Sequence, residues 1–597
     1  MKNPLRIPFV SALLLGAGAL FSACSGGGDG TAASLNGTLS VSLTDAPSNQ
    51  VDSFRVKVTA IDVVKSNTTL VHALAGPVEV DLADLADTGA LLNSVTATVG
   101  NFVGVNITLD MSTAVCLLAG KATAATVHDD QGTAFLAPVV VQLNIPGFLA
   151  LSGSHQKLIE LDLDLSQSLA IDAANNTVEF TPAFVVRSVL AQQKPVAIAG
   201  TIASVDAVGS SFVLTLLDAN SATIGSLTCV SDNATVFQTD GTPNTGAAGL
   251  TALSLLSVGT WVQAQGTIDA ASANVLVTNV NAGIGTWNGG TDIVEGVVID
   301  RVGGAGADAT LTVLGRSVNS AHDTFQYNTS FTVDTTLAGT HVVRHASATS
   351  YDTDELNIGQ QVRVFGALTG ATMDASTGVV REQPTWIFGA AAGAPSGGQL
   401  TLSLVSVGLR DQALFNWNAD PANFVTDVGT LADALAIANG TNVVERGFFA
   451  PVSGGAPDFT ADKVVNADTA PALVLVRNRL ATGFGVVLTC TTGQIDITIS
   501  GSAAAGEYAL LDQGFVGISD LPSVPTPDIV PAGATGLYSL RDITNGTMVL
   551  YTHFPTFSSA VNSAVGLGAQ VRHVAAVGSW TSSTSTIHAG LVSIVVE

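Results

Sequence analysis

Three carboxylates alternate with leucine in the segment Glu160-Leu-Asp162-Leu-Asp164. Alternate side chains of an extended strand point to the same face, so these three are expected to form a row with neighbours about 7 Å apart. Carboxylate pairs at comparable separations act as acid and base in glycosidases, and oxygen-rich clusters bind calcium. The sequence therefore offers Glu160, Asp162 and Asp164 as a candidate calcium site, which Asp45 and Asp172 could complete from nearby turns. A solvated strand face that binds nothing is the competing interpretation.

Cys24 is a second candidate site, because its position in the sequence indicates chemistry. It follows a basic end with Lys2 and Arg6, an apolar stretch from Ile7 to Leu20, and the residues Phe21-Ser-Ala. This order is typical of a secretory signal. The last four residues resemble a lipobox, the cleavage motif of bacterial lipoproteins, whose cysteine sulfur carries the lipid. An ordinary secretory signal with a chance cysteine is the alternative.

The segment that follows Cys24 is rich in glycine and serine, so residues 25–34 are expected to form a flexible tether. Membrane lipid attached to Cys24 would then anchor the folded part of the chain. Ser25 stands where retention in the inner membrane usually requires aspartate. By resemblance to Gram-negative sorting rules, this favours a lipoprotein of the outer membrane, with the side of the membrane left open.

Other chemistry-bearing residues are scattered. The sequence contains no nucleophile elbow, phosphate-binding loop or zinc-protease motif. Cys116, Cys229 and Cys490 lie in apolar, strand-like contexts and are expected to be buried, unpaired thiols, although a disulfide between two of them stays open. Five tryptophans could stack on sugars if exposed, but packing is the expected role.

The composition restricts the class of partner. Charged residues make up 11% of the chain, against about 25% in an average soluble domain. Acidic residues outnumber basic ones by 47 to 21, which gives a formal net charge of −26. Such a chain repels polyanions, so nucleic acid is not an expected partner.

Strands with one apolar face dominate the first part of the chain. Leu39, Val41 and Leu43 alternate with polar residues, and the same period-two pattern recurs through residues 35–191. Many such strands joined by short turns predict a β-sandwich. Three stretches resemble the bacterial family called domain of unknown function 4382: residues 39–47, residues 78–102 and residues 161–182. The resemblance implies a domain common in exported lipoproteins and no established activity.

An internal repeat marks the remainder of the chain. Its pattern, Gly-x-x-Val-x-x-x-Gly, predicts a turn with positive φ at the first glycine and a strand bend or bulge at the second. The first two copies resemble a second bacterial family, domain of unknown function 5666, which often occurs in tandem. The copies begin at Gly259, Gly359, Gly440 and Gly568, and the fourth ends in Ala575.

These signals together predict an all-β protein, an N-terminal β-sandwich followed by a tandem array of small β-barrel-like modules. Glycine clusters at residues 285–290 and 389–398 are the expected linkers. The predicted division is signal 1–24, tether 25–34, sandwich 35–191, and modules at 196–282, 292–390, 391–476 and 477–597.

The expected function is that of a non-catalytic, lipid-anchored envelope protein. Arrays of this kind serve as structural spacers, adhesins or ligand-binding arms, with a polysaccharide or a protein at the cell surface as the ligand. The alternative is an enzyme that acts on envelope or extracellular glycans through paired carboxylates. Neither alternative requires a cofactor beyond the candidate calcium.

Overall fold

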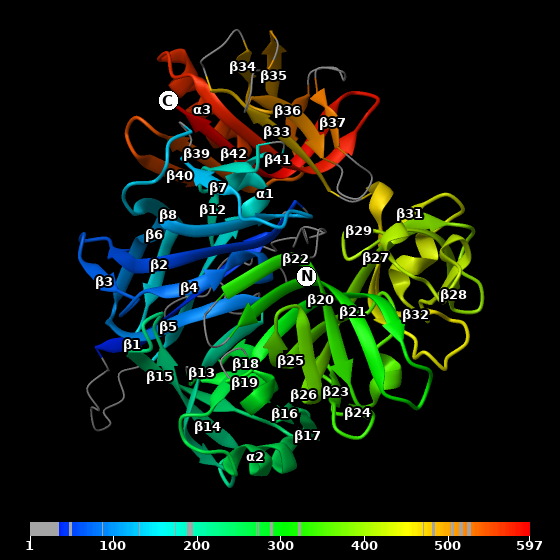
Figure 1. The fold of residues 1–597 in the computed structure, drawn as a ribbon. Coiled ribbons are helices and arrows are strands. Elements are labelled where there is room, and N and C mark those ends of the chain that lie inside the picture. Colours follow the sequence, from blue (N-terminus) through cyan, green and yellow to red (C-terminus); the bar gives the residue numbers. More distant parts are fainter. Residues whose placement is uncertain are drawn as a thin grey trace.

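The computed structural model describes most of the chain after the expected tether. The described residues are 35–46, 50–85, 88–129, 132–173, 175–187, 195–269, 271–272, 274–286, 290–319, 324–469, 471–479, 484–501, 503, 507–512, 518–521 and 527–597. Strands predominate throughout, and five bodies of sheet follow one another along the chain (Figure 1). The predicted fold class is confirmed.

The N-terminal body is a sandwich of two sheets. One sheet has the strand order β12-β9-β1-β5 and the other the order β3-β2-β6-β8, with β4 beside β2. Their elements are β1 (Asn36–Ala46), β2 (Val51–Lys65), β3 (Leu70–His72), β4 (Val78–Asp81), η1 (Leu82–Leu85), β5 (Gly89–Thr98), β6 (Gly100–Leu118), β8 (Val139–Leu151), β9 (Gln156–Asp164) and β12 (Phe184–Arg187). A small third sheet contains β7 (Thr126–His128), β10 (Leu169–Asp172) and β11 (Thr177–Phe180), and α1 (Leu165–Ser168) joins β9 to β10.

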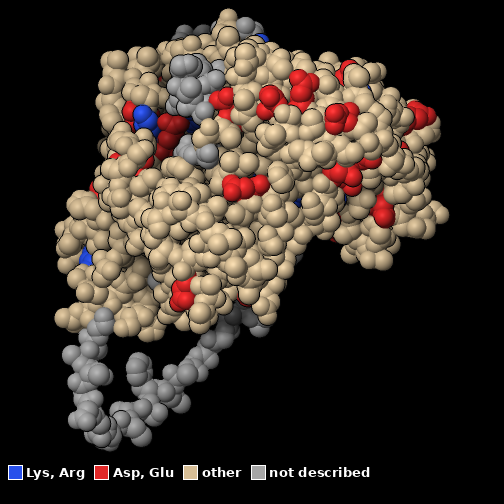
Figure 2. All heavy atoms as spheres, turned by 60° about the horizontal axis from the view of Figure 1, so that its bottom comes forward, with Lys and Arg blue, Asp and Glu red and all other residues tan. Residues whose placement is uncertain are grey.

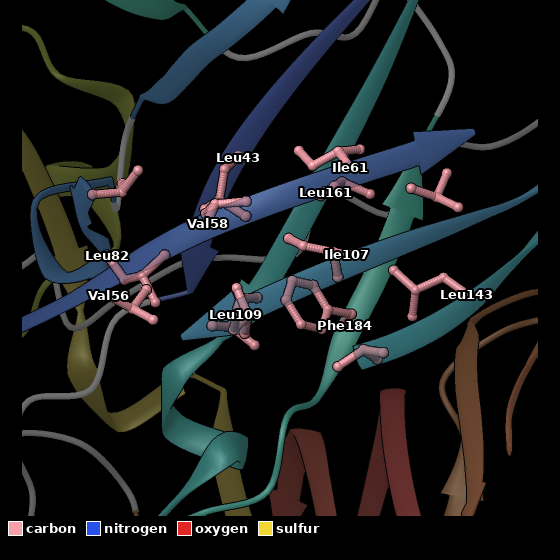
Figure 3. Packing of buried hydrophobic residues seen from close by; sticks show 14 of the residues in the cluster. Leu43, Val56, Val58, Ile61, Leu82, Ile107, Leu109, Leu143, Leu161 and Phe184 are labelled. Atoms are coloured by element: carbon pink, nitrogen blue, oxygen red, sulfur yellow. The ribbon is translucent and has the colours of Figure 1, made fainter. Parts of the chain in front are cut away.

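The sandwich core follows from the alternation in the sequence. Leu43, Leu161 and Phe184 from one sheet meet Val58, Ile107 and Leu143 from the other (Figure 3). All six side chains are buried. Because residues on one face of a strand recur every second position, the period-two pattern places this whole set on the inner faces.

Three closed five-stranded barrels follow, which we call barrel 1, barrel 2 and barrel 3. In each, the strands that close the ring pair in the order first, second, third, fifth, fourth, first, with the third and fifth parallel. This is a five-stranded Greek-key barrel like the OB-fold. Each barrel has its own apolar core.

The bounds of the barrel elements are as follows. Barrel 1 contains β13 (Val196–Asp206), β14 (Ser211–Leu217), β15 (Thr223–Val230), β16 (Val236–Thr239), β17 (Thr242–Thr245), α2 (Gly246–Ser254), β18 (Trp261–Ile268) and β19 (Val275–Ala282). Barrel 2 contains β20 (Asp292–Val302), β21 (Ala309–Asn319), β22 (Thr324–Thr335), β23 (His341–Arg344), β24 (Ser350–Tyr351), η4 (Thr353–Glu355), β25 (Gln361–Thr369) and β26 (Thr372–Gln383), with η3 (Gly283–Gly285) before it. Barrel 3 contains β27 (Thr385–Ala391), β28 (Gln399–Val407), β29 (Arg410–Asp411), η5 (Gln412–Leu414), η6 (Pro421–Asn423), β30 (Phe424–Asp427), η7 (Ala432–Ala436), β31 (Asn442–Phe449), β32 (Phe459–Asn466) and η8 (Ala467–Thr469).

The last body, here the C-terminal module, is more elaborate. Its strands β33, β41 and β42 keep the relation of the first, fourth and fifth strands of a barrel, and α3 precedes β41. Its elements are β33 (Ala472–Arg477), β34 (Gly485–Cys490), β35 (Ile495–Ser500), β36 (Tyr508–Asp512), β37 (Ile518–Asp520), β38 (Asp528–Pro531), β39 (Leu537–Asp542), β40 (Thr547–Tyr551), α3 (Phe554–Gly566), β41 (Val571–Thr581) and β42 (Thr586–Val596).

Two expected domain boundaries fall inside strands. The boundary at 390/391 lies within β27, and the boundary at 476/477 lies within β33. The glycine cluster at 389–398 is not a linker between domains, because its first three residues belong to β27 and residues 392–398 form the turn into β28. The strands therefore place barrel 3 at residues 385–466 and the C-terminal module at residues 472–596.

The repeat pattern marks the same two places in each unit. The first glycine has positive φ in all four copies: Gly259 (90°), Gly359 (93°), Gly440 (82°) and Gly568 (99°). The second glycine lies at a register shift of the fourth strand against the fifth in all three barrels. In the C-terminal module, where Ala575 replaces that glycine, β41 shifts its register against β42 at two other places, between Val571 and His573 and between Val577 and Gly578.

The modules curl around the sandwich instead of extending from it (Figure 1). Strand β5 of the sandwich pairs in parallel with β13 of barrel 1, so one sheet runs through both bodies. Ile358 of barrel 2 packs into the core of barrel 3, and Met548 of the C-terminal module packs into the core of the sandwich.

We predict that replacing Gly447 with alanine destabilises barrel 3. A Cβ at this position would overlap the carbonyl oxygen of Thr460 on the facing strand, and overpacking of this kind costs about 1–3 kcal/mol. Gly393→Ala is the matched control, because a Cβ at Gly393 meets no atom within 4 Å. Urea denaturation compares the two variants, and equal loss of stability in both would contradict the steric explanation.

Candidate functional site

The acidic row lies on a central strand of the sandwich. Strand β9 pairs with β1 on one side and with β12 on the other. Its leucines belong to the sandwich core, so Glu160, Asp162 and Asp164 share the opposite face. These three residues are only 4%, 5% and 6% exposed. The shared face agrees with the sequence prediction, but the expectation of a solvated face is wrong.

The buried carboxylates are engaged in local structure. Asp164 caps α1, accepting hydrogen bonds from the backbone N–H of Gln167 at 3.1 Å, from Gln167 Nε2 at 2.6 Å and from Ser166 Oγ at 2.5 Å. Asp162 accepts from Thr44 Oγ1 at 2.8 Å, and Asp45 accepts from the backbone N–H of Leu165 at 3.0 Å. Burial raises the pKa of Asp164, and the hydrogen bonds from Ser166 and Gln167 oppose this rise.

The described residues contain no group of three or more acidic, histidine or cysteine side chains arranged to hold a metal ion. Calcium at Asp164 would have to compete with its capping bonds. Asp172 lies at the end of β10 in the small third sheet, and its side chain accepts from the backbone N–H of Asn175 at 3.0 Å.

A network of ion pairs joins the sandwich to barrel 2. Arg316 on β21 reaches Asp81 at 3.0 Å and Asp84 at 3.2 Å, both in the sandwich, and Glu295 on β20 at 3.2 Å. Arg363 on β25 also pairs with Glu295, at 3.0 Å. Asp81 additionally accepts from Ser53 and from the backbone of Phe54, so the sandwich holds this carboxylate in place.

In this network, the attraction between opposite charges outweighs the cost of burying them. Burial opposes ionisation of Glu295, but Arg363 and Arg316 together lower its pKa well below the usual range. Burial likewise disfavours charge on Arg316, but Asp84, Glu295 and Asp81 outweigh it and raise the pKa of Arg316. Sequence reasoning missed this network, because Arg316 and Asp81 are 235 positions apart and no motif connects them.

A cavity of about 60 Å³ lies next to this network, where the sandwich, barrel 2 and barrel 3 meet; we call it the junction cavity. Strands from three bodies and the turn before β29 form its walls. Its lining residues are Asp52, Asp84, Leu117, Glu295, Gly296, Gly315, Arg316, Asn328, Gln361, Gly408, Leu409 and Arg410.

A second buried ion-pair cluster joins the sandwich to the C-terminal module. Glu179 on β11 pairs with Arg477 and with Arg479, and only Arg479 of the three is more than slightly exposed. His573 lies beside Arg477 across the β33–β41 pair and is 2% exposed. Burial and the charge of Arg477 lower the pKa of His573 to about 3, so this side chain is neutral at physiological pH.

Glu445 is a buried acid inside barrel 3. It lies on β31, it is completely buried, and it accepts one hydrogen bond, from Thr426 Oγ1 at 3.1 Å. Its Oε2 atom has no partner among the described residues. Burial raises the pKa of Glu445 to about 8.

The structure places the remaining predicted residues as follows. Cys24 and residues 25–34 lie outside the described residues. Within the described part of the chain, no disulfide joins Cys116, Cys229 and Cys490; the first two are buried, as expected, whereas Cys490 is only half-buried. Trp386 is buried, and Trp261, Trp417 and Trp580 are half-buried. The described tryptophans therefore pack against protein, as expected. In the described part of the chain, no helix has the length and apolar character needed to cross a bilayer.

We predict that Arg316→Met destabilises the protein by about 3–5 kcal/mol, the usual cost of removing one partner of a buried ion pair. Asp81 and Asp84 would lose their arginine, and Glu295 would keep only Arg363. Arg446→Met is the control, because Arg446 pairs with the half-exposed Asp462 and such pairs contribute less than about 1 kcal/mol. Urea denaturation measures the stability of both variants. Similar losses of stability would show that the buried network contributes no more than an exposed ion pair.

We predict that Glu445→Gln makes the stability of the protein less dependent on pH. In the unfolded chain the carboxyl ionises near its ordinary pKa of 4.5, but in the folded chain it stays protonated up to about 8. Folding therefore takes up a proton between these values, and wild-type stability falls as pH rises through them. Each pKa unit corresponds to about 1.4 kcal/mol, so the total is a few kcal/mol.

Glutamine cannot ionise, so the variant should gain stability over the wild type at pH 9 and not at pH 4. Denaturation at both values tests this, with the exposed Asp433→Asn as the matched control in the same barrel. A parallel pH dependence in wild type and Glu445→Gln would exclude Glu445 as the cause.

The comparisons with known proteins concern the sandwich. No curated protein matches the chain. Residues 36–182 match the family model described as Domain of unknown function (DUF4382), from the first residue of β1 to just beyond β11. The family resemblance predicted from the three N-terminal stretches is thus confirmed for this domain: the sandwich is similar to the DUF4382 family.

Proposed function

We propose that the protein is a non-catalytic, lipid-anchored component of the bacterial cell envelope whose compact body binds a ligand. The single observation that carries this proposal is the compact arrangement of the five bodies, with ion pairs of Arg316 and Glu179 at two of their contacts. An extended spacer would not need ion pairs between residues more than 200 positions apart. Of the three roles expected for such an array, the arrangement therefore favours ligand binding over a spacer.

The anchoring part of the proposal rests on the sequence. The segment ending in Phe21-Ser-Ala-Cys24 and the following tether support lipid on Cys24, and Ser25 supports the outer membrane. The resemblance of the repeats to domain of unknown function 5666 supports an exported protein in the same way. A polysaccharide or a protein at the cell surface is the proposed class of large partner.

The surface charge supports the exclusion of nucleic acid. Figure 2 shows acidic side chains spread over one face of the molecule and very few basic ones. A polyanion would meet repulsion there.

The alternative, a glycan-active enzyme, gains no specific support. Its candidate carboxylates at Glu160, Asp162 and Asp164 are buried, and a glycosidase must bring both carboxylates to the substrate. Calcium binding by the same row stays a proposal. An unchanged melting curve in millimolar calcium would exclude it, because a ligand that binds only the folded state raises stability.

We predict that Cys24→Ala releases the folded body from the membrane fraction or leaves an unprocessed precursor. Each lipid CH₂ that enters the bilayer contributes about 0.8 kcal/mol, so several acyl chains anchor firmly. Metabolic labelling with palmitate measures the modification, and Ser22→Ala is the control because it keeps a small residue and the cysteine. Palmitate on the Cys24→Ala variant would contradict the assignment.

A further inference from the structure

The junction cavity contains polar groups that the protein itself does not use. Arg316 pairs with both Asp84 and Glu295, as described above. The side chain of Asp52 lines the cavity and forms no hydrogen bond or ion pair with the described residues. Arg410 donates one hydrogen bond, from Nη1 to the carbonyl oxygen of Gly408 at 3.3 Å, and no ion pair shorter than 4.0 Å reaches it from the described part of the chain.

Gln361 adds a buried amide to this wall. It is 4% exposed, and its Oε1 atom has no hydrogen-bond partner among the described residues. A buried polar atom without a hydrogen-bond partner costs free energy. The native state therefore becomes more stable when a bound molecule supplies that hydrogen bond. The cavity thus presents one unpaired carboxylate, one guanidinium with free N–H groups and one amide.

We propose that the junction cavity binds a small zwitterion of amino-acid size. Arg410 donates to the carboxylate of the ligand, and Asp52 accepts from its ammonium group. The Oε1 atom of Gln361 accepts a further hydrogen bond from the same ammonium group. The proposal deepens the ligand-binding function proposed above, and it does not depend on the lipid anchor.

The charges in the cavity select this class of ligand. A simple cation would pair with Asp52 but meet Arg410, and a simple anion would pair with Arg410 but meet Asp52. A zwitterion complements both, and an arginine–carboxylate pair is among the strongest hydrogen-bonded contacts. Asp52 already acts on Arg410 electrostatically: burial lowers the pKa of Arg410, and the charge of Asp52 opposes this.

The size of the cavity limits the ligand. One water-sized group needs about 10–15 Å³ of such space, so the cavity of about 60 Å³ holds roughly four to six. Pockets for drug-sized molecules are much larger, at about 300–1,000 Å³. A free amino acid with a small side chain fits this limit, and Leu117 and Leu409 provide apolar contact for its carbon atoms.

The test is isothermal titration calorimetry of the full-length chain in mild detergent. Glycine and L-alanine are the zwitterionic probes, acetate and methylammonium each carry one of the two charges, and D-glucose is a neutral polyol. The variants are Asp52→Asn and Arg410→Met, with Arg446→Met as the control because it removes an arginine from barrel 3 without touching the cavity. Melting curves establish that each variant is folded.

The expected result is one site for glycine or L-alanine, with a Kd at least ten-fold weaker in Asp52→Asn and in Arg410→Met and unchanged in Arg446→Met. Binding of neither amino acid would overturn the proposal, and so would binding that both cavity variants retain. Binding of D-glucose alone would replace the zwitterion by a polyol. None of these outcomes affects the proposed lipid anchor, which the palmitate experiment tests separately.

Discussion

The arrangement of this protein depends on arginine side chains that reach from one body of the fold to oxygen atoms of another. The chain has only 21 basic residues, yet several of them lie at contacts between bodies. Arg316 joins barrel 2 to the sandwich, and Arg477 and Arg479 join the C-terminal module to it. Arg381 of barrel 2 donates to Gln238 of barrel 1 and to the carbonyl oxygen of Gly285. A planar guanidinium with five donors suits such contacts, since one side chain can serve several acceptors.

These polar contacts determine how the bodies are oriented relative to one another, and each body has an apolar core of its own. Burying a charge is costly unless its partners are well placed, so an arginine at a contact tolerates few alternative orientations of the two bodies. Arg381 is the clearest example of a buried charge that depends on well-placed partners. It is 2% exposed and lies over the ring of Phe365 without a described carboxylate partner. Burial lowers its pKa to about 9. Apolar contacts, such as Ile358 in the core of barrel 3, then reinforce the same arrangement.

The sequence predicted what depends on local periodicity. Alternation at Leu39, Val41 and Leu43 identified the sandwich, and the paired glycines at Gly440 and Gly447 identified the turn and bulge of a repeated barrel. It did not predict what depends on long-range contact. The burial of the acidic row at Glu160 could not be predicted, because alternation shows which face a residue occupies and not whether another segment covers that face. Arg410 lies in no motif and Gln361 occupies a variable position of the repeat, so only the meeting of three bodies gives them a shared cavity.

A compact arrangement of five bodies around a small polar cavity differs from the extended row of modules that tandem repeats often form. The most direct test of this arrangement is small-angle X-ray scattering of the folded body, residues 35–597. If the arginine contacts hold the five bodies together, the radius of gyration is close to that of a compact chain of this length, about 25 Å. A row of separate modules would give a radius of gyration clearly above that of a compact chain, and that result would contradict the account.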